Sequence, residues 1–159
     1  MSNSNKTPNI TEVELVYHNK QKPSERINIP SSEHAYRLFY DTWDKGKLEL
    51  QEQFRVILLD QRSSCLGIST LASGGVSQCI VDLKLVFALA LKAKASGIIL
   101  AHNHPSGNKK PSENDKTLTA QFSVAGRILD IPVLDHLIIT TEGYTSMAVE
   151  KLMSGHSMK

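Results

Sequence analysis

Residues 98–101 form a short, wholly apolar run (IILA), with Ser96 and Gly97 before it and polar residues after it. A continuous apolar run of this length between turn residues predicts a central strand that is covered on both faces. Such a strand needs neighbouring strands and further elements packed above and below it. The chain has 159 residues, which is enough for one domain with a real core.

Strand and helix patterns alternate along the rest of the chain. The alternating EVELVY sequence predicts a strand at residues 12–17, and Pro30-Ser31-Ser32 is a helix start signal. Further strands are predicted at residues 54–60, 65–71 and 133–140 and after Gly143, and helices from Ser32 to near Asp44, from Asp82 to about Ala95 and from Ser112 to about Leu129. The second helix is apolar almost all round, so we expect it to be largely buried. This alternation predicts an α/β layered domain.

The first residues of the sequence do not have the pattern of a secretory signal. Residues 1–9 are polar and lack the apolar stretch of a secretory signal. We expect them to be disordered ahead of a single domain at residues 10–159. The longest apolar run, residues 85–91, is far too short to span a bilayer. These observations predict a soluble, cytoplasmic protein with no membrane partner.

Net charge and cysteine content argue against two classes of function, nucleic-acid binding and a cysteine-bound zinc site. The formal net charge is +2, which is too small to imply a nucleic-acid partner by itself. The two cysteines, Cys65 and Cys79, have no CxxC spacing, which argues against a cysteine zinc site. They could form one disulfide, but two reduced thiols in a cytosolic protein are the favoured interpretation.

Two histidines follow the predicted central strand. His102 and His104 are two residues apart, and side chains at this spacing on a strand point to the same face, whereas Asn103 points to the other. Two neutral imidazoles side by side suit a borderline metal such as zinc. The alternative is a pair of polar loop histidines without a metal.

Asp115 adds a carboxylate to this pair. It lies three residues before Leu118, on the same stripe of the predicted helix as Leu118 and Phe122. A carboxylate directed at the core is costly unless something pairs with it, and a metal held by two histidines would do so. The alternative is a capping box, in which Ser112 caps the start of the helix and the Asp115 side chain bonds back to the backbone of Ser112. The two roles are compatible.

The full spacing resembles a known metalloprotease motif. Histidine, one residue, histidine, seven residues, serine, two residues and aspartate resemble the JAMM (MPN+) motif at every position. The letters HNHPSG, followed by Pro111-Ser112 and Asp115, look like the RadC family of JAMM-type proteins. The segments Glu52-Gln53-Phe54 and Leu134-Asp135-His136 agree, and the resemblance covers roughly residues 31–150. It implies a JAMM/MPN-type α/β domain, with a mixed sheet flanked by helices and layered like a cytidine deaminase.

The resemblance also implies a chemistry. It assigns Zn²⁺ to His102, His104 and Asp115, with the fourth position left to water, the arrangement of a catalytic zinc. It makes Glu52 the general base and Ser112 the hydroxyl that stabilises the developing oxyanion, for hydrolysis of a peptide or isopeptide bond. Without the resemblance, Glu52 reads as a solvated carboxylate in a charged stretch, and Glu49 is its nearest rival.

Three further polar residues accompany the motif. We interpret His136 as structural, or as a residue behind the metal ligands, rather than as a ligand itself. Lys109 and Lys110 lie in the loop beside the predicted site. They could meet an acidic substrate, although a solvated role is the simpler interpretation.

Several rival functions are excluded by missing motifs. The letters HNH do not indicate an HNH nuclease, whose residues are spread over a ββα unit, and neither HExxH nor PCxxC is present. The remaining alternative is a DNA-repair-associated or protein-interaction module with a structural or vestigial zinc site. RadC proteins carry a helix-hairpin-helix segment before the JAMM domain, and the residues ahead of position 31 show none. We therefore expect DNA binding to be weak, non-specific and lost as salt rises.

Overall fold

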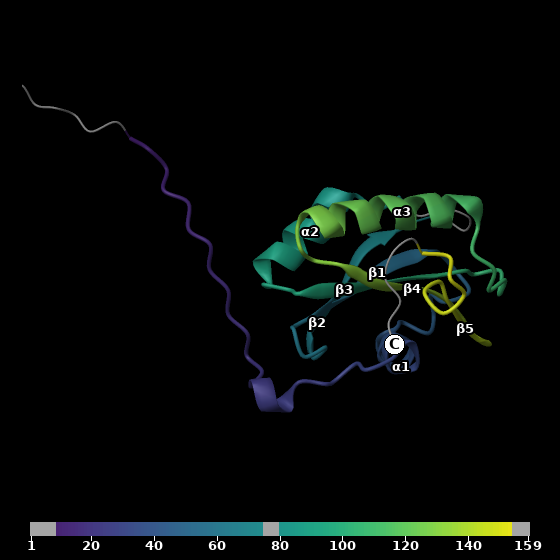
Figure 1. Ribbon diagram of the computed structural model, residues 1–159. Helices are drawn as coiled ribbons and strands as arrows, with labels where there is room; N and C mark the ends of the chain where they lie inside the picture. The colour runs from purple at the N-terminus through teal and green to yellow at the C-terminus, as the bar shows by residue number, and fades with distance from the viewer. Residues whose placement is uncertain (1–8, 75–79, 154–159) are drawn as a thin grey trace, which may run out of the picture.

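The computed structural model describes residues 9–74 and 80–153, which build a five-stranded mixed sheet with helices on both faces (Figure 1). The strands are β1 (Gln53–Leu59), β2 (Cys65–Ser73), β3 (Gly97–Asn103), β4 (Val133–Thr140) and β5 (Gly143–Ser146), in the spatial order β2-β1-β3-β4-β5. The helices are α1 (Ser32–Thr42), α2 (Leu83–Lys92) and α3 (Glu113–Ile128), preceded by a single 3-10 turn, η1 (Pro23–Glu25). Helices α2 and α3 cover one face of the sheet and α1 the other (Figure 1). The predicted α/β layered class is confirmed.

β3 is the middle strand, as its apolar run predicted. It pairs antiparallel with β1 and parallel with β4, and every residue in it is buried. A parallel pair needs a long crossover, and α3 supplies it by running back over the sheet. Consequently the C-terminal end of β3 and the N-terminal end of α3 meet at the same edge of the sheet.

The central strands build two cores because alternate side chains point to opposite faces. The core beneath α2 and α3 contains Phe54, Leu100 and Phe122, and the ring centroids of Phe54 and Phe122 are 5.8 Å apart. The core on the other face contains Phe39 of α1 and Ile99 of β3. The sheet is therefore covered on both sides along its central strands.

The helix starts agree with the sequence signals. The N-cap residues are Ser31, Asp82 and Ser112, and each side chain accepts a hydrogen bond from a backbone N–H in the first turn. These N–H groups have no partner inside the helix, so a capping oxygen stabilises the start. This local chemistry explains why the three starts could be predicted.

Two predictions about the elements are wrong. Residues 12–17 are extended but belong to no strand in the described part of the chain, because alternation alone supplies no hydrogen-bonding partner. Helix α2 is not largely buried: Val86 and Phe87 are buried, but Leu85 and Leu91 are 56% and 48% exposed. Only one side of α2 rests on the sheet, so its other apolar residues remain outside.

Some predictions fall outside the described ranges. Residues 1–8 of the predicted disordered tail and the thiol of Cys79 lie there. Cys65 is half-buried and has no disulfide partner among the described residues. Within the described ranges, no helix has the length and apolarity needed to cross a membrane.

Candidate metal centre

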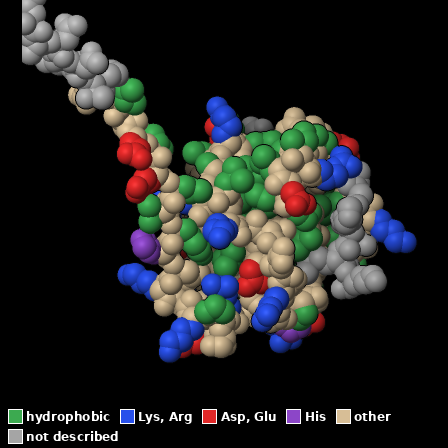
Figure 2. Space-filling view, turned by 60° about the vertical axis from the view of Figure 1, so that its left-hand side comes forward, with side chains coloured by type: hydrophobic (Ala, Val, Ile, Leu, Met, Phe, Trp, Pro, Cys, Tyr) green, Lys and Arg blue, Asp and Glu red, His purple; other side chains and the backbone are tan. Residues whose placement is uncertain are grey.

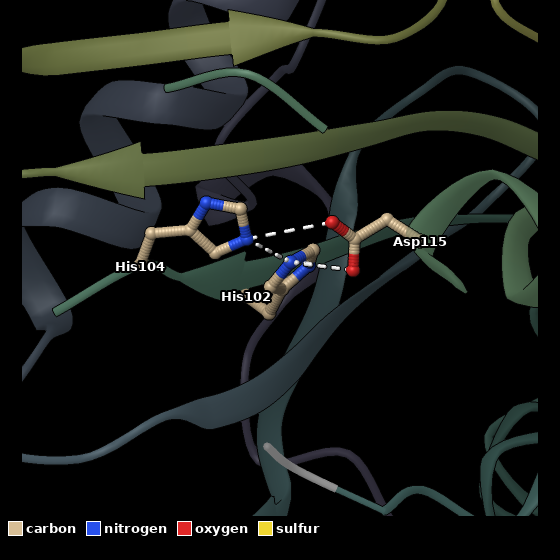
Figure 3. Close-up of side chains that lie close together, drawn as sticks. All are labelled: His102, His104 and Asp115. Atoms are coloured by element: carbon tan, nitrogen blue, oxygen red, sulfur yellow. Dashed lines mark hydrogen bonds and ion pairs between the residues drawn. The ribbon is translucent and has the colours of Figure 1, made fainter. Parts of the chain in front are cut away.

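Three predicted ligands meet where β3 ends and α3 begins. His102 lies at the end of β3, His104 in the loop that follows, and Asp115 in the first turn of α3. Their side chains point toward one another (Figure 3). His102 is 6% exposed and the other two side chains are 13% exposed. The chain crossover therefore brings together ligands that the sequence separates by up to thirteen positions.

The donor atoms of the three side chains lie close to one another. The Nε2 atoms of His102 and His104 are 3.0 Å apart. The Asp115 carboxylate oxygens lie 3.1 Å from the first and 3.4 Å from the second. Ligands at the usual zinc distances are separated by about 3.3 Å in a tetrahedral site. Among the described residues this is the only such cluster of metal-binding side chains, and one donor atom from each residue lies within 4.8 Å of the other two.

The electrostatics of the cluster favour a cation. Burial opposes ionisation of Asp115, but hydrogen bonds from His102 and His104 and from the Ser112 N–H hold the pKa of its carboxyl well below its usual range. Burial likewise opposes a charge on His104, yet its hydrogen bond to Asp115 raises its pKa overall. A permanent carboxylate thus faces two imidazoles, and a positive charge between them is stabilised.

A backbone carbonyl orients His104. Its Nδ1 lies 2.7 Å from the carbonyl oxygen of Asn108. A carbonyl can only accept, so the Nδ1–H donates this hydrogen bond. If a metal replaced the Nε2 proton that otherwise donates to Asp115, the neutral ring would carry its lone pair on Nε2, the atom that faces His102 and Asp115.

A buried relay orients His102 in the same way. The Thr119 hydroxyl donates to the carbonyl of Asp115 at 2.6 Å, so its oxygen accepts from Nδ1–H of His136 at 2.6 Å. Burial, and then the neighbouring His102 charge, lower the pKa of His136 well below its usual value, so this ring is neutral. Its Nε2 must accept from Nδ1–H of His102, 2.8 Å away. As a neutral metal ligand, His102 would therefore present the lone pair of its Nε2 to the site.

In this relay His136 contacts His102 and is not part of the cluster of His102, His104 and Asp115. The neighbouring Asp135 points to the other face of the sheet, where its buried carboxylate accepts hydrogen bonds from Ser32 of α1 and Ser146 of β5, each at 2.6 Å. Thr119 was missed by the sequence analysis. Its position four residues after Asp115, on the same helix face, was the available signal.

Glu52 lies beside the cluster, immediately before β1. Phe54 is paired with His102 across the sheet, so continuing this register by two residues sets Glu52 opposite His104. Glu52 is half-buried and lines the pocket that contains the three ligands. Its rival Glu49 is exposed, does not line the pocket, and accepts a hydrogen bond from the Thr141 hydroxyl at 3.2 Å.

Asn103 fixes the segment that carries Glu52. This fully buried side chain accepts a hydrogen bond from the Gln53 N–H at 2.7 Å. Its amide donates to the carbonyls of Leu48 and Gln51 at 2.8 and 2.9 Å. The sequence predicted that Asn103 points away from the histidines, and this is confirmed. Its function as an anchor for the Glu52 segment was not predicted.

Ser112 has the capping role that the sequence allowed. Its hydroxyl oxygen accepts from the Asp115 N–H at 3.1 Å, and its own N–H donates to the Asp115 carboxylate at 2.7 Å. A serine that accepts a hydrogen bond keeps its O–H free to donate. Because Ser112 also lines the pocket, this hydrogen is available to a bound molecule.

The ligands form one wall of a cavity of about 620 Å³. Phe54 and Leu118 add apolar surface, and the loop after β3 contributes Pro105, Pro111 and Lys110. Lys109 does not line it. The cavity is therefore mixed in character and within the usual size range of ligand-binding pockets.

Known proteins resemble this chain over most of its length. Residues 29–152 match the RadC-like JAB domain family. A UPF0758 protein of Flavobacterium johnsoniae is 46% identical over 99 residues, covering 62% of this chain and 43% of that protein. UPF0758 proteins of Methanospirillum hungatei and Porphyromonas gingivalis are 42% and 40% identical, covering 77% and 84% of this chain and 54% and 58% of those proteins. The chain thus spans about half the length of the relatives it matches.

Proposed function

We propose, from the premise that this chain belongs to the RadC-like JAB domain family, that it is a zinc-dependent hydrolase of an amide or isopeptide bond. The observation that carries the proposal is the meeting of His102, His104 and Asp115 in a pocket that Glu52 and Ser112 also line. A metal ligand set, a carboxylate that is not a ligand and a free hydroxyl are the components that amide hydrolysis needs. Their arrangement around one cavity supports a single reaction centre.

The ligands would hold zinc through two imidazole Nε2 atoms and one carboxylate. When bound, zinc would supply Lewis acidity and would lower the pKa of a water at the site to about 7. The carboxylate of Glu52 takes a proton from the attacking water as the water oxygen bonds to the carbonyl carbon. It then delivers that proton to the amide nitrogen as the carbon–nitrogen bond breaks. The Ser112 O–H donates to the carbonyl oxygen while negative charge develops there.

Chelator-sensitive turnover is the test of the proposal. The purified chain, assayed against peptide and isopeptide-linked libraries, should show hydrolysis that a chelator abolishes and added zinc restores. A DNA-associated or protein-interaction module would instead show zinc-independent binding and no turnover. Fluorescence anisotropy with duplex and single-stranded DNA across a salt series separates the two, because weak contacts to phosphates disappear as salt rises. Tight DNA binding at physiological salt, without hydrolysis, would overturn the proposal.

Thr119→Val should weaken zinc binding although Thr119 touches no metal. Valine keeps the shape but removes the hydroxyl that accepts from His136, so the tautomer of His136, and through it that of His102, is no longer fixed. Losing such a hydrogen-bond partner behind a metal ligand typically costs about 10–100-fold in metal affinity.

Competition with a chromophoric chelator measures the zinc affinity of each variant. Thr117→Val is the matched control, since that exposed hydroxyl bonds only the carbonyl of Glu113. Equal zinc affinity in the Thr119 and Thr117 variants would refute the relay.

A further inference from the structure

An extended segment at residues 11–17 has an apolar side that its own domain does not cover. Val13, Leu15 and Tyr17 share one side of the extended chain because side chains alternate. Val13 and Leu15 are 89% and 79% exposed, whereas Tyr17 packs against the core beneath α2 and α3. Figure 2 shows hydrophobic and acidic side chains along this segment as it leaves the body of the protein. The apolar side of the segment is therefore packed against the domain at Tyr17 and exposed to solvent at Val13 and Leu15.

Strand β2 has an outer edge that lacks a neighbouring strand in the described part of the chain and could accept such a segment. It is one of the two edge strands of the sheet, and all its residues are half-buried or exposed, whereas every residue of β1 and β3 is buried. Leu66, Leu71 and Ala72 pack against the core only in part. An uncovered edge strand presents backbone N–H and C=O groups that can pair with another strand.

The chain already makes contacts along the outer edge of β2. The N–H of Cys65 donates to the Ile27 carbonyl at 2.8 Å, and Asn28 forms an antiparallel bridge with Ser64. The Asn19 amide donates to the Leu66 carbonyl at 3.4 Å. These contacts stop at the start of β2. Beyond them, from Gly67 to the end of the strand, no described residue pairs with the outer edge.

We propose that residues 11–17 of one copy pair with β2 of a second copy as an added strand, and that two copies exchange these segments. The exposed segment points away from its own domain (Figure 1). The open edge of β2 and the bare apolar side of the segment belong to the same chain, so a second copy offers the complement of each. Pairing satisfies the edge of β2 and brings Val13 and Leu15 beside its partly buried leucines. The acidic Glu12 and Glu14 then lie on the solvent side. Adding a strand to a sheet edge is a recurrent mode of recognition.

The oligomeric state of the full chain tests directly whether two copies swap these segments. Sedimentation equilibrium should find a dimer. The double variant Val13→Glu/Leu15→Glu should raise its dissociation constant on the order of 100-fold or more, since two apolar side chains lose their burial. Glu12→Gln/Glu14→Gln is the matched control on the opposite side of the segment and should remain dimeric.

Hydrogen exchange identifies which copy supplies the strand. Amides in residues 11–17 and in β2 should be protected together, and both should lose protection on dilution below the dissociation constant. Protection unchanged by dilution means that the segment folds onto its own β2 and overturns the proposal. A monomer at all concentrations, or a dimer that the double glutamate variant leaves intact, overturns it as well. None of these readouts depends on metal or hydrolysis.

Discussion

Replacing both His102 and His104 with alanine should reduce the zinc content of the purified protein from about one ion per chain to none. Asp115 would then be the only ligand left at the site, and a single carboxylate does not hold zinc against the ligands of the medium. The three ligands are brought together only in the folded chain, so metal binding adds directly to the stability of the folded state. Zinc should therefore raise the melting temperature of the wild type and have no effect on the double variant.

Elemental analysis and thermal melts with and without chelator measure both effects. His18→Ala/His34→Ala is the matched control, because these histidines are exposed and lie outside the cluster. It should retain full zinc content. A wild-type protein that is isolated without zinc and fails to take it up would contradict the metal centre and the proposed reaction with it.

Glu52→Gln should separate metal binding from catalysis. Glutamine keeps the size of the side chain but cannot accept the proton of the attacking water. Loss of a positioned base costs about 10²–10⁴-fold in rate, and zinc should remain because Glu52 is not one of the clustered ligands. Asp115→Asn should behave differently, since losing a charged ligand weakens the metal itself. Zinc content and turnover measured on the same preparations distinguish the two variants.

Glu49→Gln is the internal control for this assignment. Glu49 lies three residues away but outside the pocket, bonded to Thr141, so its variant should retain wild-type turnover. An active Glu52→Gln with an inactive Glu49→Gln would show that the wrong glutamate had been chosen. Unchanged turnover in both would mean that no carboxylate base is required.

The elements of the fold were largely predictable because their signals are local. The central strand, the strands β1 and β2 and the helix starts depend on side chains within a few residues of one another. Ser112 illustrates this, since its hydroxyl and the Asp115 N–H that it caps are three residues apart. The exceptions, residues 12–17 and the bare side of α2, depend on which partner covers them. Periodicity specifies that a face is apolar, but not what packs against it.

The candidate site likewise has features that local sequence signals predict and features that depend on tertiary contacts. The sequence by itself predicted the three side chains that meet, because His102 and His104 are two residues apart where a strand ends and Asp115 follows at a helix start. Only the tertiary structure decided which glutamate lines the pocket, that His136 and Thr119 orient His102, and that Asn103 anchors the Glu52 segment. Those contacts join residues 17 to 55 positions apart. Their partners are chosen by the pairing of β1, β3 and β4 and by the packing of α3, which no local pattern encodes.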